Sequence, residues 1–142
     1  MLHGQKPYAL KVCAKYDLIT EGAVEGVLRE RRIMGQLRHP LICQLVQADQ
    51  DDKFLYMLEE YCAGGDLFSL LERQGKLRES SCRFYIACIA DALAYMHNQL
   101  VIYRDLNPEN LLLDANGFPK LIDFGCAFQF DTKGEGVERS YQ

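Results

Sequence analysis

Three features are missing from this sequence, and each absence argues against a class of protein. No apolar run approaches the roughly 18 residues of a membrane-spanning helix. The six cysteines form no Cys-x-x-Cys pair, so the sequence indicates neither a zinc site nor a disulfide framework. A net charge of -4, with basic residues spread along the chain, argues against a nucleic-acid-binding surface. We therefore expect a soluble protein of a reducing compartment, cytoplasmic or nuclear, with no membrane span and no nucleic-acid partner.

The cysteines and the one local group of arginines have structural explanations. Most cysteines lie inside apolar runs, where a reduced thiol packs as a small hydrophobic side chain. On a predicted helix, Arg29, Arg31, Arg32 and Arg38 are interleaved with apolar residues, which indicates a solvated face. With 142 residues, 49% of them hydrophobic, the chain can bury one ordinary core and is one globular unit or part of one.

Residues 1–61 predict a small antiparallel sheet that carries one helix. The expected elements are a strand at 8–14, a helix at 21–37, and strands at 41–46 and 54–60. His39-Pro40 ends the helix, because a residue before proline is pushed out of helical backbone geometry. The polar segment 49–52 supplies the turn between the last two strands.

A Gly64-Gly65 pair separates this unit from a mainly helical one. We predict a hinge at 62–65, then a second unit at 66–127 that begins with helices at 66–74 and 80–97. Ser80 or Ser81 would cap the longer helix. Hairpin-like strands follow at 101–102 and 111–114, and the Asn116-Gly117 turn leads into a strand at 120–123. Residues 128–142 lack periodicity and predict an unstructured or incomplete tail.

Lys11 and Glu30 occupy positions where a charge is costly. Lys11 lies in a strand with apolar neighbours, and Glu30 falls between Val27 and Met34 on the apolar face of the helix. An ion pair between Lys11 and Glu30 would remove the cost for both. Alternatively, Lys11 extends its ammonium group to solvent, and Glu30 turns to water at the edge of the apolar face.

Two polar segments follow apolar runs in the second unit. The loop at 103–110 lies between apolar runs, and Asp123-Phe124-Gly125 follows the apolar pair at 121–122. Asp105, Asn110 and Asp123 offer the oxygen ligands that a hard cation such as Mg²⁺ prefers, together with a phosphate partner. The same residues could instead be only turn formers, since Asp and Asn favour turns.

The polar segments, the Lys11 strand and the hinge follow one another in an order that resembles the signature set of eukaryotic protein kinases. The segments YALK, CAGGDLF, YRDLNPENLLLD and LIDFG are similar to the AGC group, nearest its cyclic-nucleotide-dependent members. The resemblance covers Tyr8 to Ala127. It implies an α+β, two-lobed kinase fold that is partial at both ends, and a serine/threonine kinase domain that transfers the γ-phosphate of ATP.

This resemblance implies a role for each candidate residue in binding ATP and Mg²⁺. The phosphates and the metal would be held by Lys11 with its partner Glu30, and by Asn110 and Asp123. The adenosine would be held by Ala9 and Leu112 around adenine, by the backbone from Glu60 to Cys62 at its edge, and by Asp66 at the ribose. The lobes would be joined by a column of apolar side chains, Met34, Leu45, Tyr103 and Phe124.

The resemblance also implies how a substrate is bound and turned over. Asp105, beside Arg104, would orient the substrate hydroxyl or accept its proton. Asp66 and Glu109 match acids that receive an arginine of the substrate in basophilic kinases, which implies a basic peptide. A regulatory domain that binds cyclic nucleotides would lie outside this chain.

Four departures from the family pattern argue against full activity. The Gly-rich loop over the phosphates is missing, and the chain leaves the pattern after Ala127. Asn107 replaces a lysine of the family, which we expect to reduce turnover about ten- to a hundred-fold. Glu59 stands at the gatekeeper position, where an acid could compete for Lys11.

These departures indicate a fragment or a degenerate copy, with the apolar faces of the helix at 80–97 left exposed. The alternative to a kinase is a catalytically impaired pseudokinase that binds nucleotide or serves as a scaffold. Cys126 has two interpretations, a buried inert thiol or an exposed redox or covalent handle.

Overall fold

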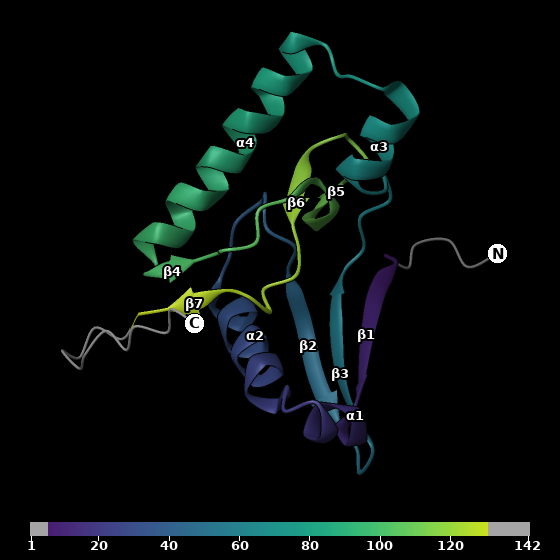
Figure 1. Cartoon of the computed structure of the whole chain (residues 1–142), viewed down its shortest axis with the longest axis vertical. Helices are drawn as coiled ribbons and strands as arrows, with labels where there is room; N and C mark the ends of the chain where they lie inside the picture. The colour runs from purple at the N-terminus through teal and green to yellow at the C-terminus, as the bar shows by residue number, and fades with distance from the viewer. Residues whose placement is uncertain (1–5, 131–142) are drawn as a thin grey trace.

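The computed structural model describes residues 6–130, and their first half forms a three-stranded sheet with two helices (Figure 1). The elements are β1 (Tyr8–Ala14), α1 (Lys15–Thr20), α2 (Val24–Gln36), β2 (Leu45–Gln50) and β3 (Phe54–Glu60). The strand order is β1-β3-β2, and both pairings are antiparallel. In the figure α2 lies alongside β2. The predicted sheet with its helix is therefore confirmed.

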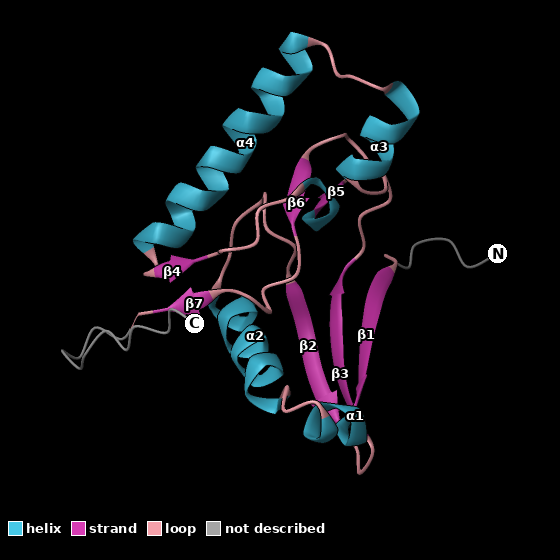
Figure 2. Cartoon of the chain, in the orientation of Figure 1, coloured by secondary structure: helices cyan, strands magenta, loops and turns pink. Residues whose placement is uncertain are grey.

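The second half is mainly helical and lies beyond the hinge (Figure 2). Its elements are α3 (Leu67–Gln74), α4 (Glu79–Asn98), β4 (Val101–Ile102), a 3₁₀ turn (Pro108–Asn110), β5 (Leu111–Leu113), β6 (Pro119–Leu121) and β7 (Phe128–Gln129). Two short antiparallel sheets, β5-β6 and β4-β7, complete it. No helix among residues 6–130 is both long and apolar enough to cross a membrane.

The hinge is fixed to the second half by close backbone contact. Gly64 donates its N–H to the Leu113 carbonyl at 2.8 Å, and the Leu113 N–H returns a bond to Gly65 at 2.8 Å. A Cβ atom on Gly64 would lie 2.7 Å from the Cβ of Leu113, so only glycine fits there. The Gly64-Gly65 pair thus permits the close packing of the hinge against β5.

The predicted strand at 41–46 is wrong, because β2 begins only at Leu45. The residues before it bond to β6 instead. The Leu121 N–H donates to Leu41, and the Cys43 N–H donates to Leu121, both at 2.9 Å. The apolar run at 41–43 is buried against the second half of the molecule, and its backbone finds partners there rather than in the sheet.

Three helix boundaries differ from the prediction. Lys15–Thr20 forms a separate helix α1. Gly22, at φ +68°, adopts a non-helical conformation between α1 and α2, and α2 begins at Val24. Neither serine caps α4: its N-cap is Arg78, without a side-chain bond. The cap of α3 is Asp66, whose carboxylate accepts the Ser69 N–H at 2.7 Å.

The interpretation of 128–142 as unstructured is wrong for its first residues, since Phe128–Gln129 forms β7. This strand pairs with β4, so β4 is not part of a hairpin with the strand after it. A two-residue strand with a distant partner leaves no periodic pattern in the sequence. Residues 131–142 lie outside the described residues.

One hydrophobic core spans both halves. It joins buried residues of α2 and the segment after it to residues of the second half, among them Ile33, Met34, Ile42, Met96, Tyr103, Leu111, Leu121 and Phe124. On α4 the apolar residues Phe84 and Ile86 remain 40% and 65% exposed. Apolar side chains of this helix are therefore exposed, as expected.

Candidate active site

A cavity of about 320 Å³ lies where β1, the end of β3, β5 and Asp123 meet. Seven of the predicted site residues line it: Ala9, Lys11, Glu30, Glu60, Cys62, Leu112 and Asp123. Ala9 belongs to β1 and Leu112 to β5, so the walls come from the two halves of the molecule. The cavity therefore brings together residues that lie more than a hundred positions apart in the sequence.

Lys11 and Glu30 form the predicted ion pair. The Lys11 ammonium group donates to both carboxylate oxygens of Glu30, at 2.7 and 2.9 Å. Glu30 is only 3% exposed, and its partner resolves the cost of burying it. Burial would lower the pKa of Lys11, but the hydrogen bond and charge of Glu30, aided by Asp123 and Glu59, outweigh burial and raise it. Lys11 is thus held as a cation inside the cavity.

Asp105 lies at the centre of a hydrogen-bonded loop. The Asn110 side-chain amide donates to the Asp105 carboxylate at 2.8 Å and to its backbone carbonyl at 3.0 Å. The Asn107 amide donates to the other carboxylate oxygen at 3.2 Å. These bonds fix the carboxylate in one orientation, which suits a group that must meet a substrate hydroxyl.

Asn107 has a structural role that the sequence did not reveal. Its side-chain oxygen accepts the N–H groups of Glu109 and Asn110, at 2.9 and 3.0 Å, and so caps the 3₁₀ turn. A lysine has no acceptor with which to make these bonds. The residue that departs from the family pattern therefore supports the loop that contains Asp105.

Two of the predicted site residues, Arg104 and Asp123, adopt left-handed backbone conformations, at φ +67° and +55°. Such angles are costly for residues other than glycine and often mark functional sites. The Arg104 Nε donates to the Cys126 carbonyl at 2.7 Å, and the guanidinium group lies over the ring of Phe128, 5.5 Å from its centre. Arg104 therefore links the Asp105 loop to the segment after Gly125.

The donor set around Asp123 suits a hard cation. The Gly125 N–H donates to one Asp123 carboxylate oxygen at 3.1 Å, and the side chain of Asp123 is exposed at the cavity. Both bonds of the Asn110 side chain use its amide nitrogen, which leaves its amide oxygen available. No group of three His, Cys, Asp or Glu side chains among residues 6–130 is arranged to hold a metal. Phosphate oxygens would have to complete such a shell, as is usual for Mg²⁺.

The predicted apolar column is assembled. Met34, Tyr103 and Phe124 are each at most 1% exposed, and Leu45 packs against the same core. The rings of Tyr103 and Phe124 meet edge to face at 5.3 Å. The Tyr103 hydroxyl also donates to the Ile122 carbonyl. The column thus joins Phe124, the neighbour of Asp123, to Met34 of α2 in one buried core.

Three other predicted residues lie elsewhere or in unexpected surroundings. Asp66 does not line the cavity, and both its carboxylate oxygens bond to Ser69. Cys126 is exposed, so its interpretation as a buried thiol is wrong. Arg31, Arg32 and Arg38 are exposed as expected, whereas Arg29 is half-buried and donates to the Gly125 carbonyl at 3.3 Å.

A buried ion pair at the hinge was not predicted. The Lys120 ammonium group donates to the Glu60 carboxylate at 3.0 Å and to the Pro40 carbonyl at 2.8 Å. Lys120 is 8% exposed. Its position between Pro119 and Leu121 carried the same signal as Lys11, a lysine in an apolar strand.

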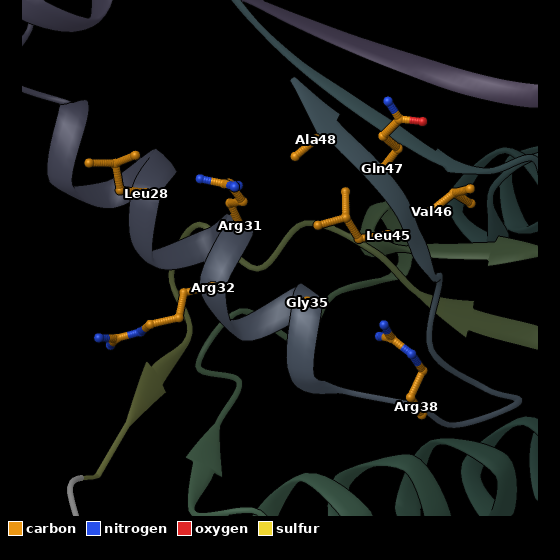
Figure 3. A pocket seen from close by; sticks show the side chains of 9 residues that line it. All are labelled: Leu28, Arg31, Arg32, Gly35, Arg38, Leu45, Val46, Gln47 and Ala48. Carbon is orange, nitrogen blue, oxygen red and sulfur yellow. The ribbon is translucent and has the colours of Figure 1, made fainter. Parts of the chain in front are cut away.

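A larger cavity, of about 440 Å³, lies away from this site (Figure 3). It is an open groove between α2 and β2, where Arg31 lies between the two elements and Arg32 extends away from β2. None of the predicted site residues lines it. Seven of the predicted site residues line the smaller cavity instead, and Asp105 lies outside both cavities.

The comparisons with known proteins agree with this geometry. A family model for the protein kinase domain matches residues 2–141. The chain belongs to the protein kinase family, whose members generally use ATP and Mg²⁺. The match continues past Ala127, where the family pattern was expected to end.

The curated relatives that match this chain include cGMP-dependent protein kinases of several organisms. The chain is 39% identical over 128 residues to cGMP-dependent protein kinase, isozyme 1, of Drosophila melanogaster, which covers 90% of this chain and 17% of that protein. It is 43% identical over 120 residues to a cGMP-dependent protein kinase of Toxoplasma gondii, covering 84% of the chain and 12% of the relative. It is 42% identical over 120 residues to cGMP-dependent protein kinase 2 of Homo sapiens, and the match covers 84% of this chain and 16% of that protein. The chain thus spans less than a fifth of the length of these relatives.

Glu59 offers a test of the electrostatics inside the cavity. Burial raises the pKa of Glu59 above its ordinary value of 4.5; the charge of Lys11 opposes this, and those of Glu30 and Asp123 add to it. The folded state then binds a proton more readily than the unfolded state, so stability falls as the pH rises above 4.5. We expect Glu59→Gln to raise the melting temperature at neutral pH and to lose this advantage in acid.

Thermal melts of the Glu59→Gln variant and the unmodified chain between about pH 4 and about pH 8 measure this effect. Glu25→Gln, an exposed change in the first turn of α2, is the matched control. An advantage of Glu59→Gln that is the same at every pH would contradict the electrostatic explanation.

Proposed function

We propose that this chain provides the ATP-binding cavity and catalytic loop of a serine/threonine kinase. The observation that carries the proposal is the Lys11–Glu30 pair, held at 2.7 Å in the same cavity as Asp123. A fixed cation beside a carboxylate that can ligate a metal is what the transfer of a phosphoryl group requires, because the charge on the phosphate must be neutralised in place.

Each residue of the candidate site then has a definite role. Lys11 would bind phosphate oxygens while Glu30 keeps its side chain in position. Asn110 and Asp123 would hold Mg²⁺, which when bound neutralises charge on the phosphates. Asp105 would orient the hydroxyl of the substrate and accept its proton, with its own orientation set by Asn107 and Asn110.

Acidic groups support a basic peptide as the substrate class. Glu109 is exposed on the 3₁₀ turn, and α3, which begins after Asp66, packs against that turn. Hydrogen bonds from Ser69 lower the pKa of Asp66, which favours its ionised form. Control by cyclic nucleotides, as the names of the relatives suggest, would depend on segments outside this chain.

Binding of Mg-ATP tests the proposal directly. We expect Mg-ATP at a hundred times its dissociation constant to add about 2.7 kcal/mol to the free energy of unfolding, seen as a higher melting temperature. Asp123→Asn should abolish the part of this increase that depends on Mg²⁺, because it removes a charged metal ligand. Asp52→Asn, in the exposed turn before β3, should leave the increase unchanged.

The outcomes separate three cases. A higher melting temperature with Mg-ATP, together with phosphoryl transfer to a basic peptide, supports a kinase. An increase without transfer supports the pseudokinase alternative, which the cap formed by Asn107 in place of a lysine favours. No increase in the unmodified chain contradicts nucleotide binding.

A further inference from the structure

Two cysteine thiols lie together at the hinge end of the cavity and have no role in the proposed chemistry. Cys43 belongs to the segment before β2, and Cys62 belongs to the hinge. Both line the 320 Å³ cavity, with exposures of 2% and 7%. A small molecule that enters the cavity can therefore meet both thiols at once.

Backbone pairing holds the two thiols in place. The Glu60 N–H donates to the Gln44 carbonyl at 2.9 Å, which extends the contact between β2 and β3 toward the hinge. The Cys43 S–H donates to the Glu60 carbonyl oxygen at 3.3 Å, and the two thiols lie close enough to change each other's pKa. The meeting of the thiols thus results from fixed strand ends rather than from a long loop.

The surroundings make the two thiols chemically unequal. The contact with Cys43 lowers the pKa of Cys62, and the nearby charge of Lys120 also lowers it, against the effects of burial and Glu60. The same contact and burial raise the pKa of Cys43. A pair in which one thiol ionises before the other can react stepwise with an oxidant.

We propose that Cys43 and Cys62 form an oxidisable dithiol, which a hydroperoxide such as hydrogen peroxide converts into a disulfide across the hinge end of the cavity. The Cys62 thiolate attacks the peroxide, so that an S–O bond forms, the O–O bond breaks and hydroxide leaves to become water. The Cys43 sulfur then attacks the sulfenic acid, so that the S–S bond forms, the S–O bond breaks and a second water leaves with the Cys43 proton. Two thiols are oxidised and one peroxide is reduced to two waters.

The disulfide has a consequence that rests on the proposed function. Its sulfur atoms must approach to about 2.05 Å, closer than two thiols that are not bonded to each other can lie. The hinge is then drawn toward the segment before β2 at the end of the cavity where adenine would bind. Oxidation should therefore weaken the binding of ATP.

Mass spectrometry of the whole chain tests the dithiol without reference to ATP. Treatment with hydrogen peroxide should remove two hydrogen atoms from the intact mass and produce a cross-linked peptide that contains Cys43 and Cys62. Cys43→Ser and Cys62→Ser should each prevent this cross-link, whereas Cys126→Ser, which removes the exposed thiol, should retain it. If either serine variant does not fold, binding of a trivalent arsenical to the unmodified chain gives a second measurement, expected as one arsenic bridging Cys43 and Cys62.

Sulfinic or sulfonic acid at Cys62 without a cross-link, or a cross-link that includes Cys126, would overturn the proposal. The increase in melting temperature with Mg-ATP is then compared before and after oxidation. Loss of this increase on oxidation and its return with dithiothreitol supports the consequence for binding. A disulfide in a chain that never responds to Mg-ATP contradicts the proposed function and leaves the dithiol established.

Discussion

Asp105→Asn is expected to lower the rate of phosphoryl transfer to a basic peptide by about a hundred- to ten-thousand-fold, the usual contribution of a positioned general base. The change removes the charge but keeps the size of the side chain. It also turns an amide group toward Asn107 or Asn110, both of which donate to this carboxylate. The loss should therefore appear in the rate of turnover.

Kinetics on the full-length gene product, with Mg-ATP and basic peptides, measure this effect. Asp105 does not line the cavity, so the increase in melting temperature with Mg-ATP should persist in the variant. Asp52→Asn, an exposed change of the same chemistry, controls for loss of one negative charge. Equal turnover in Asp105→Asn and the unmodified protein would exclude Asp105 as the base.

Lys11→Met is expected to reduce the free energy of unfolding by about 2–3 kcal/mol. The change leaves the Glu30 carboxylate, 3% exposed, without its partner. Breaking a buried pair costs about 3–5 kcal/mol, and we reduce this figure because the Lys11 side chain is 40% exposed. Glu30→Gln should cost less, since Lys11 can then extend to water.

Urea unfolding of both variants measures the difference, and Lys53→Met, an exposed change, is the control. The double variant Lys11→Met, Glu30→Leu should recover much of the lost stability, because two apolar side chains can replace a buried pair. It should nevertheless fail to respond to Mg-ATP. A double variant as unstable as Lys11→Met alone would contradict the explanation from the uncompensated charge.

The predictions that the structure confirmed rested on local features of the sequence, such as the free energy needed to bury a single charge. Lys11 and Glu30 were paired because each was expensive alone, and the structure joins them. The strand at 54–60 was predicted with its observed limits, since the turn-forming segment 49–52 precedes it and the Gly64-Gly65 pair follows it a few residues later. Local chemistry was sufficient in these cases.

The predictions that failed depended on distant partners. The segment 41–43 was assigned to the sheet, but its bonds go to Leu121. β7 could not be recognised because its partner, β4, lies far back in the chain. The cap formed by Asn107 was not predicted, because the family pattern has a lysine at this position and a lysine cannot accept the N–H groups of Glu109 and Asn110.

The Lys120 contacts determine where the molecule can flex. Lys120 of β6 holds both the Pro40 carbonyl and the Glu60 carboxylate, and the neighbouring residue Leu121 pairs with Leu41 and Cys43. The end of β3 and the segment before β2 are thus mechanically part of the second half, although the chain order assigns them to the first. We therefore expect the end of β3 and the segment before β2 to move together with β6 when the cavity opens, which hydrogen exchange with and without Mg-ATP would measure.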